Sequence, residues 1–121
     1  MKFNEIQEQI KNSIIPAVPI PFNSDGSINR DSQKSFAKWM DKQPIKCVAI
    51  WAHTGRGLYI SQQQREEVFN DWRENLSHDK LILCSVGAAY DDSIDDKAYI
   101  EKAVQMAEHA KKLGADLVLT Y

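Results

Sequence analysis

The chain has 121 residues, of which 15 are basic and 17 acidic, for a formal net charge of −2. This near balance offers no polybasic surface for nucleic acid or anionic lipid, and no apolar run approaches the roughly 20 residues that cross a bilayer. The first twelve residues contain no apolar block and do not read as a signal peptide. We therefore expect one cytoplasmic domain over residues 1–121, with no nucleic acid and no membrane as partner.

Four short runs are apolar nearly throughout, as is typical of strands buried on both faces of a parallel sheet. They cover residues 13–20, 47–51, 81–87 and 116–121. If the strands themselves are taken to begin at Ile15, Cys47, Leu81 and Asp116, their starts lie 32, 34 and 35 residues apart. Each interval has room for one helix and two loops, which predicts repeated βα units.

The intervals carry helical patterns, and a short amphipathic helix is predicted before the first run. Ser61 and Gln64 form a capping-box pattern at the start of the second interval, and Asn29 or Asp31 could cap the first. The third interval ends with two lysines and then Gly114, as a helix end often does. The apolar faces consist of Phe3, Ile6 and Ile10; Phe36, Trp39 and Met40; Val68, Trp72 and Leu76; and Tyr99, Ala103, Met106, Ala107, Ala110 and Leu113.

These units predict an α/β protein with a parallel sheet, and two architectures fit. One is the N-terminal half of a (β/α)8 TIM barrel, about four units of a fold that typically needs ~250 residues. The other is a small doubly wound parallel sheet, which could be complete at this length. The chain stops at a predicted strand, at Tyr121, and this favours a partial barrel.

The sequence predicts no metal site and no cofactor. Cys47 and Cys84 fall inside apolar runs and are expected to be buried thiols, because a lone pair in a cytosolic chain is seldom a disulfide. The aspartates between residues 91 and 96 are expected to be a solvated helix start. His109 stands outside the apolar stripe of its helix and is expected on the helix surface.

The stretch with the strongest chemical character is the loop after the second run, where the apolar residues lead directly into His-Thr-Gly-Arg-Gly. It could be an ordinary polar turn. It could also be a loop that holds a small acidic molecule, since glycines allow a tight turn, successive N–H groups can surround an anion, and Thr54 adds a hydroxyl.

Motifs occur in order along the whole chain. The first is AVPIPF at residues 17–22, followed by Asp25-Gly26. The next are AHTGRG at 52–57 and ISQQQREEV at 60–68, and then SVGA at 85–88 and Gly114-Ala115-Asp116. In order and spacing they resemble the dihydrodipicolinate synthase and N-acetylneuraminate lyase family of class I aldolases. In that family the second strand ends in a G-T-T-G-E loop before a helix start, the third strand ends in G-x-G, and the fourth strand follows G-A-D.

The resemblance implies a lyase that forms a Schiff base between a lysine on the sixth strand and pyruvate or a related 2-keto acid. It also implies a (β/α)8 barrel, assembly as a homo-oligomer and no cofactor. The residues implied to bind the substrate are Thr54, His53 and Gly55, in the loop that takes the pyruvate carboxylate. The catalytic lysine, and a tyrosine of the fifth strand, would lie beyond Tyr121, so the 121 residues alone are expected to be inactive.

Several positions depart from the family pattern. His53 stands where the family has a hydroxyl of the proton relay, and Arg56 stands where it has an acidic residue. Ala52, Ile20 and Ser85 also differ. Two other functions remain open: a non-catalytic half-barrel, and a nucleotide-binding α/β module with Gly55-Arg56-Gly57 against a phosphate, although the third glycine of G-x-G-x-x-G is missing.

Overall fold

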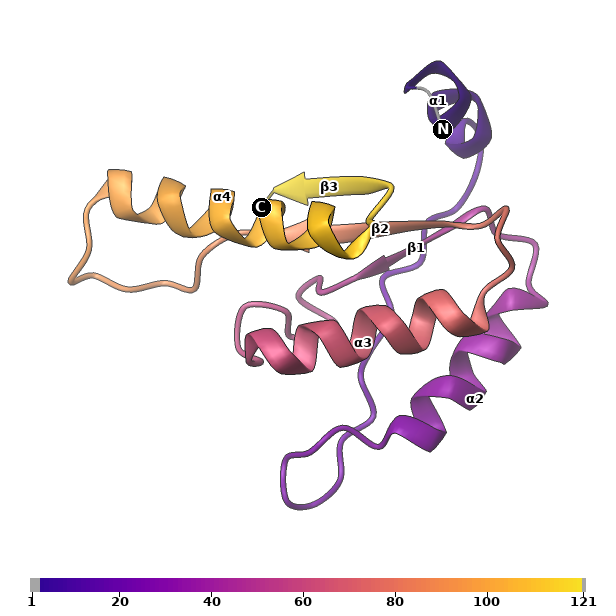
Figure 1. Ribbon diagram of the computed structural model, residues 1–121, viewed down its shortest axis with the longest axis horizontal. Helices are drawn as coiled ribbons and strands as arrows, with labels where there is room; N and C mark the ends of the chain where they lie inside the picture. The colour runs from indigo at the N-terminus through magenta and orange to yellow at the C-terminus, as the bar shows by residue number, and fades with distance from the viewer. Residues whose placement is uncertain (1–2, 121) are drawn as a thin grey trace.

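The computed structural model describes residues 3–120 and is built on a three-stranded parallel sheet (Figure 1). Its strands are β1 (Cys47–Ile50), β2 (Leu81–Val86) and β3 (Leu117–Thr120), in the order β1-β2-β3. Cys47 lies opposite Leu81 and Leu83 opposite Leu117, so all carboxyl ends lie at one edge. The three later apolar runs are therefore strands, as predicted.

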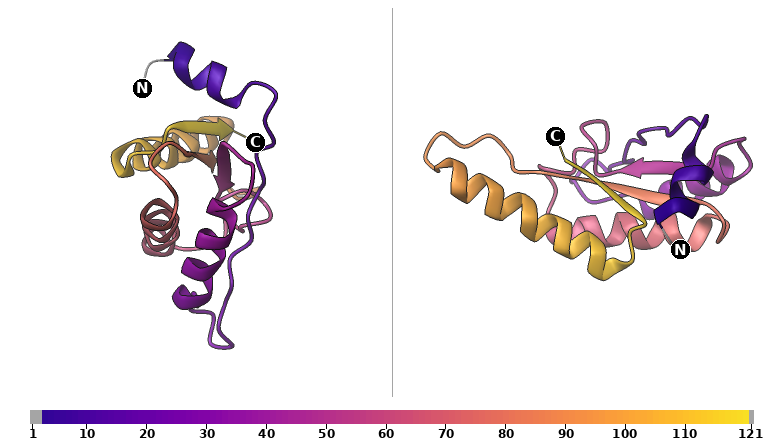
Figure 2. Two further views of the ribbon diagram at one scale, coloured as in Figure 1. Left: turned by 90° about the vertical axis from the view of Figure 1, so that its right-hand side faces the viewer. Right: turned by 90° about the horizontal axis from the view of Figure 1, so that it is seen from above.

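Four helices complete the described part of the chain: α1 (Phe3–Ile10), α2 (Arg30–Asp41), α3 (Gln62–Asn75) and α4 (Asp96–Leu113). Helices α3 and α4 lie on the same side of the sheet, and α2 packs against α3 (Figure 2). Strand order follows chain order without reversal. A doubly wound sheet would reverse its order and carry helices on both faces, so this arrangement favours barrel-type βα units.

The core forms between the sheet and its helices. Alternate strand residues face the helices, and Val48, Ile50 and Ile82 are completely buried there. Val68 and Trp72 of α3 and Met106 of α4 belong to the same cluster. Strands β1 and β2 thus read as nearly continuous apolar runs because both of their faces are covered for most of their length.

The first predicted strand, residues 13–20, is not a strand. It runs beside β1 with a single bridge between Ala17 and Ala49, where Val18 N donates to Ala49 O at 3.1 Å. Prolines at positions 16, 19 and 21 have no N–H group to donate to a ladder. The segment is therefore extended against β1 without becoming a fourth strand.

The helix ends follow the sequence closely. Ser61 and Gln64 make the predicted capping box, and Gly114 ends α4 in the left-handed conformation with φ 102°. Asn29, rather than Asp31, caps α2 by accepting from Ser32 N. The apolar face predicted for α2 was partly wrong, because Trp39 is 55% exposed and the buried positions are Gln33, Ala37 and Met40.

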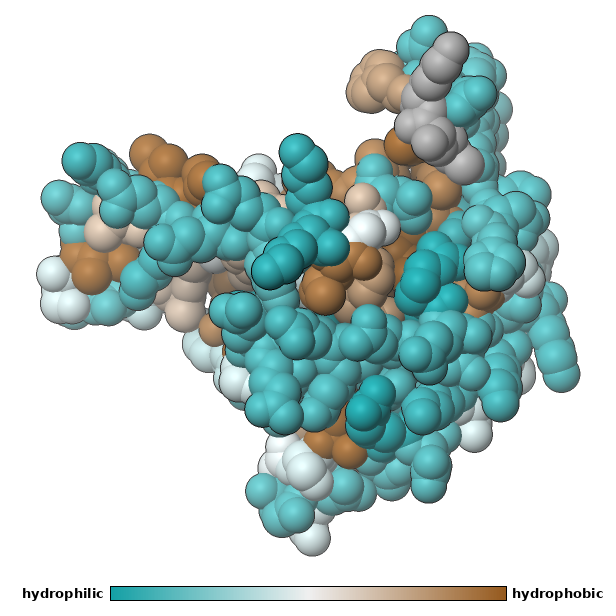
Figure 3. Space-filling model, in the orientation of Figure 1, coloured by the Kyte–Doolittle hydropathy of each residue, from teal (hydrophilic) through white to brown (hydrophobic). Residues whose placement is uncertain are grey.

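A large apolar surface remains open along α4 and β3. Ile100, Val104, Val118 and Leu119 are all about half exposed or more, and Figure 3 shows brown patches on the projecting arm that contains the first part of α4. Between α4 and β3 the surface is hollowed into an apolar groove bordered by Val104, Ala107 and Leu117. Across residues 3–120, no helix is long and apolar enough to span a membrane.

Candidate functional site

The candidate site is the loop of residues 51–61, at the carboxyl end of β1. The strand ends at Ile50, and Trp51 turns the chain sharply with a positive φ of 60°. Arg56 N then donates to His53 O, and Gly57 N to Ala52 O, which closes the loop on itself. In a parallel α/β sheet this edge is where ligand-binding loops gather.

Two glycines let the loop pack directly on the backbone beneath it. A Cβ on Gly57 would lie 2.0 Å from Trp51 O, and one on Gly55 would lie 3.0 Å from Val18 O. Both glycines are buried. They are required by the close approach of two backbone segments, since neither has a positive φ.

The structure places the three predicted substrate-binding residues next to one another on this loop. Thr54 and His53 are exposed, whereas Gly55 is buried. Within residues 3–120, the N–H groups of Thr54 and Gly55 donate to no backbone carbonyl, unlike those of Arg56 and Gly57. Two consecutive amides without backbone acceptors, next to a hydroxyl, are suited to binding a carboxylate.

The loop is fastened to α3 by Arg65 and Trp51. Arg65 Nη1 donates to the carbonyls of Gly57, at 3.4 Å, and Ile60, at 3.2 Å. In return, Trp51 Nε1 donates to Arg65 O at 3.1 Å, and the Arg65 guanidinium lies 5.9 Å from the centre of the Trp51 ring. The indole is completely buried. The ring of the first loop residue and the backbone of the later part of the loop are therefore both held by α3.

The sequence predicted that His109 lies on the helix surface, and this prediction was wrong. Its side chain is only 10% exposed, and Nε2 lies 2.9 Å from Glu66 Oε1 of α3. Its imidazole stacks on Trp51, with ring centroids 5.9 Å apart and planes inclined by 10°. One signal was available: His109 follows Met106 by three residues and so lies beside the buried stripe of α4.

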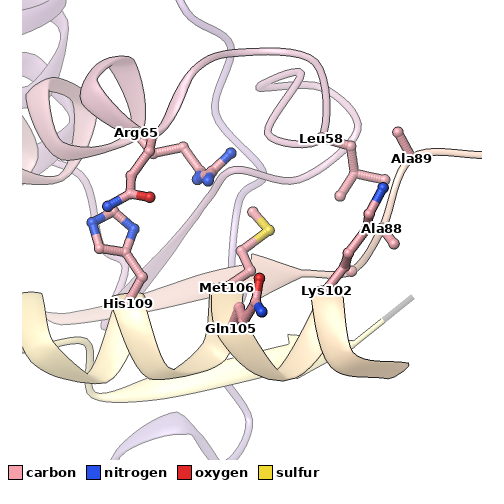
Figure 4. Close-up of a pocket in the computed structure, with 10 residues that line it drawn as sticks. Leu58, Arg65, Ala88, Ala89, Lys102, Gln105, Met106 and His109 are labelled. Atoms are coloured by element: carbon pink, nitrogen blue, oxygen red, sulfur yellow. The ribbon is translucent and has the colours of Figure 1, made fainter. Parts of the chain in front are cut away.

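A pocket of about 270 Å³ opens between α3 and α4, next to these residues (Figure 4). Arg65 enters it from α3, while Lys102, Met106 and His109 enter it from α4. Ala88 lies on the segment after β2, at the same carboxyl edge as the candidate loop. The pocket therefore extends from the carboxyl edge of the sheet, where the candidate loop lies, toward helices α3 and α4.

The cysteines and the aspartates before α4 agree with what the sequence predicted for them. Both cysteines are free and buried, and burial raises the pKa of the Cys47 thiol to about 12. Asp95 caps α4 by accepting from Ala98 N, so the acidic group is a helix start. Among the described residues, no group of three or more histidine, cysteine or acidic side chains could hold a metal ion. The prediction of no metal and no cofactor stays a prediction.

Comparison with known proteins gives the wider context of this loop. The family model described as "Dihydrodipicolinate synthetase family" matches residues 11–121, which is nearly the whole chain. The chain belongs to this family. The resemblance inferred from the motifs is thereby confirmed.

Two curated relatives illustrate the range of the family. A 4-hydroxy-tetrahydrodipicolinate synthase from Bartonella bacilliformis is 29% identical over 105 residues, which are 87% of this chain and 33% of that protein. An N-acetylneuraminate lyase from Pasteurella multocida is 22% identical over 104 residues, or 85% and 32%. The chain thus spans about a third of the length of the curated relatives it matches.

Solved structures confirm the fold. Dihydrodipicolinate synthase from Aquifex aeolicus superposes with a TM-score of 0.72 at 18% identity, covering 89% of this chain and 33% of that one. A family protein from Coccidioides immitis gives a TM-score of 0.75 at 16% identity, covering 89% and 33%. These neighbours are TIM barrels. The chain is therefore an α/β portion of a (β/α)8 barrel, and the doubly wound alternative is set aside.

Proposed function

We propose that this chain supplies the substrate-carboxylate loop of an aldolase-type lyase that acts on pyruvate or a related 2-keto acid. The observation that carries the proposal is the closed loop after β1, in which the Thr54 and Gly55 amides find no backbone acceptor among residues 3–120 and lie beside the Thr54 hydroxyl. Family membership supports the same reaction class, because the relatives are a synthase and a lyase of this type.

The loop's part in the reaction is to bind and orient the acid. A carboxylate placed against the two amides and the Thr54 hydroxyl would be held by charge-assisted hydrogen bonds. His53 and Arg56 add basic groups to the same exposed loop and favour an anionic ligand. Orientation of the ketone carbon toward an attacking amine would follow from fixing the carboxylate end.

The covalent step is proposed for a lysine outside these 121 residues. A lysine that attacks a ketone must lose its proton near neutral pH, which requires a desolvated site. Lys38 of α2 and Lys102 and Lys111 of α4 are exposed and do not meet this requirement. We further propose that the whole protein is a cytoplasmic homo-oligomer that needs no cofactor.

Reductive trapping tests the proposal. The whole protein to which this chain belongs is incubated with pyruvate and other 2-keto acids, then treated with borohydride and weighed by mass spectrometry. The Schiff base forms with loss of water, and hydride from borohydride plus a proton convert it into a stable secondary amine, so each active acid adds its mass less one oxygen atom to one lysine. Thr54→Val removes the hydroxyl at nearly constant volume and should raise the half-saturating acid concentration by roughly tenfold or more, while Thr54→Ser should restore it.

If no 2-keto acid leaves an adduct, the protein is not a Schiff-base lyase, and the second candidate function, a non-catalytic barrel segment, takes its place. If the adduct forms but Thr54→Val leaves the half-saturating acid concentration unchanged, the protein is a Schiff-base lyase whose carboxylate site does not include this loop.

A further inference from the structure

We propose that His109 is a positioning residue: its ring, held by Glu66, supports the indole of Trp51 and so fixes the backbone of the candidate substrate loop. The inference rests on the proposed function only for its effect on the keto acid. The structural part concerns a contact between α4 and the loop after β1, two elements that the sequence places about 50 residues apart.

The first step is the orientation of the imidazole. A carboxylate oxygen accepts hydrogen bonds, so the 2.9 Å contact between Glu66 Oε1 and His109 Nε2 places an N–H group of the imidazole at Nε2. The second ring nitrogen, Nδ1, is buried and has no hydrogen-bond partner among the described residues. A phenylalanine would fill the same space without that orphaned atom. The hydrogen bond to Glu66 is therefore the feature that only the imidazole supplies, and it sets the plane of the ring.

The second step is transmission to Trp51. The imidazole lies nearly parallel to the indole, 10° apart in plane. Stacked rings keep a preferred offset and resist tilting. Since Trp51 Nε1 also donates to Arg65 O, the indole is held both by a face contact and by a directional hydrogen bond. The Arg65 and His109 side chains come from α3 and α4 (Figure 4).

The third step runs from the indole to the loop. Trp51 has a positive φ of 60°, a conformation that few non-glycine residues adopt without support from their surroundings. The Trp51 carbonyl also forms the surface on which Gly57 lies, with no room for a methyl group between them. A tilt of the indole would thus move the peptide that carries the loop, and with it the Thr54 and Gly55 amides.

Hydrogen exchange of the whole protein tests the positioning step without any ligand. His109→Ala should speed exchange of the hydrogen-bonded Arg56 and Gly57 amides by about three- to tenfold, whereas the amides of α2 should be unchanged. His109→Phe keeps a stacking ring but loses the hydrogen bond to Glu66, so it should speed exchange of these amides less than His109→Ala does. His78→Ala, on the exposed loop before β2, is the matched control.

Unchanged exchange at Arg56 and Gly57 in His109→Ala would overturn the proposal, as would a rise spread evenly over α4 and β2. Equal effects from His109→Phe and His109→Ala would also overturn it, because the ring would then not be the support.

Keto-acid trapping supplies the functional readout. A looser loop weakens ground-state and transition-state binding alike, so His109→Ala should raise the half-saturating pyruvate concentration by about three- to tenfold and leave the limiting rate near wild type. Glu66→Ala should shift it in the same direction by less, since the ring stays but loses its orienting partner. If His109→Ala instead lowered the limiting rate by about three- to tenfold and left the half-saturating pyruvate concentration unchanged, the positioning role would be contradicted. Failure of the wild type to trap any acid would refute the proposed function alone, because the exchange experiment still decides the role of His109.

Discussion

Arg30, at the start of α2, donates two hydrogen bonds to Asp71 of α3, from Nε to Oδ2 at 3.0 Å and from Nη2 to Oδ1 at 2.7 Å. The Asp71 side chain is fully buried, while that of Arg30 is 44% exposed. Gln33 Nε2 adds a third hydrogen bond to the same carboxylate at 2.9 Å. The packing of α2 on α3 thus includes a buried charge whose main partner reaches it from the surface.

Removing Arg30, the partner of the buried Asp71 carboxylate, should lower the free energy of unfolding. Arg30→Met keeps the aliphatic stem but leaves Asp71 without its bidentate donor, and we expect the free energy of unfolding to fall by about 2–3 kcal/mol. Urea denaturation of the protein measures the change. Lys97→Met breaks the exposed pair with Glu101 and should change stability by less than about 0.5 kcal/mol. Equal effects of both substitutions would mean that burial adds nothing to the Arg30 pair.

The same carboxylate predicts a dependence of stability on pH. Burial alone would raise the pKa of Asp71, but hydrogen bonds from Arg30 and Gln33 and the charges of Arg30 and Lys34 outweigh it and hold that pKa below the usual 3.8. The folded state therefore favours the ionised form. The stability that the ionised Asp71 adds to the folded state is complete above pH 3.8, and it is lost as the pH falls through the lower pKa that Asp71 has in the folded state.

Denaturation curves of wild type and Asp71→Asn between pH 7 and pH 2 test this sign. The difference in unfolding free energy should be constant at neutral pH and should shrink below pH 3.8. A difference that grows on acidification would show that the pKa of Asp71 is raised instead.

Gly57→Ala should displace the candidate loop. The new methyl group would meet Trp51 O at 2.0 Å, a backbone atom that cannot rotate away. We expect a loss of about 1–3 kcal/mol from overpacking, measured by thermal unfolding, together with weaker trapping of pyruvate. Gly26→Ala is the control, because its Cβ meets nothing within 4 Å and its cost arises only from a φ of +86°. It should lower stability without changing trapping, and a loss of trapping there would point to a general effect of loop glycines.

The family resemblance of the sequence implies that His53 takes the place of a relay hydroxyl, and this catalytic role stays a prediction. If its imidazole takes part in proton transfer, His53→Ala in the whole protein should lower kcat by roughly 10²–10⁴-fold, as loss of a general acid or base does. Unfolding free energy should hardly change, because His53 is exposed. Steady-state kinetics and denaturation of the same variant give both numbers. An unchanged kcat would make His53 an ordinary loop residue.

The isolated 121-residue polypeptide should associate with itself. Val104 is 49% and Val118 48% exposed along the α4–β3 groove, and among the described strands β3 pairs only with β2. Apolar surface and an unpaired strand edge both favour association. Light scattering over a concentration series should show a mass above that of one chain, and Val104→Glu with Val118→Lys should reduce it. A stable monomer of the unaltered polypeptide at high concentration would contradict this expectation.

Local signals in the sequence determined the elements and their ends. The capping box at Ser61, the glycine at Gly114 and the nearly continuous apolar run of β2 each act within a few residues of backbone. Such short-range preferences hold in almost any tertiary setting. The position of the polar loop at the carboxyl end of β1 followed from the same reading, since a strand with a helix after it fixes where the loop must lie.

The tertiary structure alone decided which distant side chains meet. The pairing of Arg30 with Asp71 joins residues 41 positions apart, and that of Glu66 with His109 joins residues 43 apart. The pattern of α4 placed His109 beside its apolar stripe but contained nothing about Trp51, whose ring reaches α4 only because β1 and β2 pair in one register. Residues 13–20 show the same limit: their apolar run predicted a strand, yet ladder hydrogen bonds need N–H donors that prolines lack, so the segment only lies along β1. Long-range contacts depend on how whole helices and strands pack, so they cannot be predicted from the two contacting residues and their immediate neighbours in the sequence.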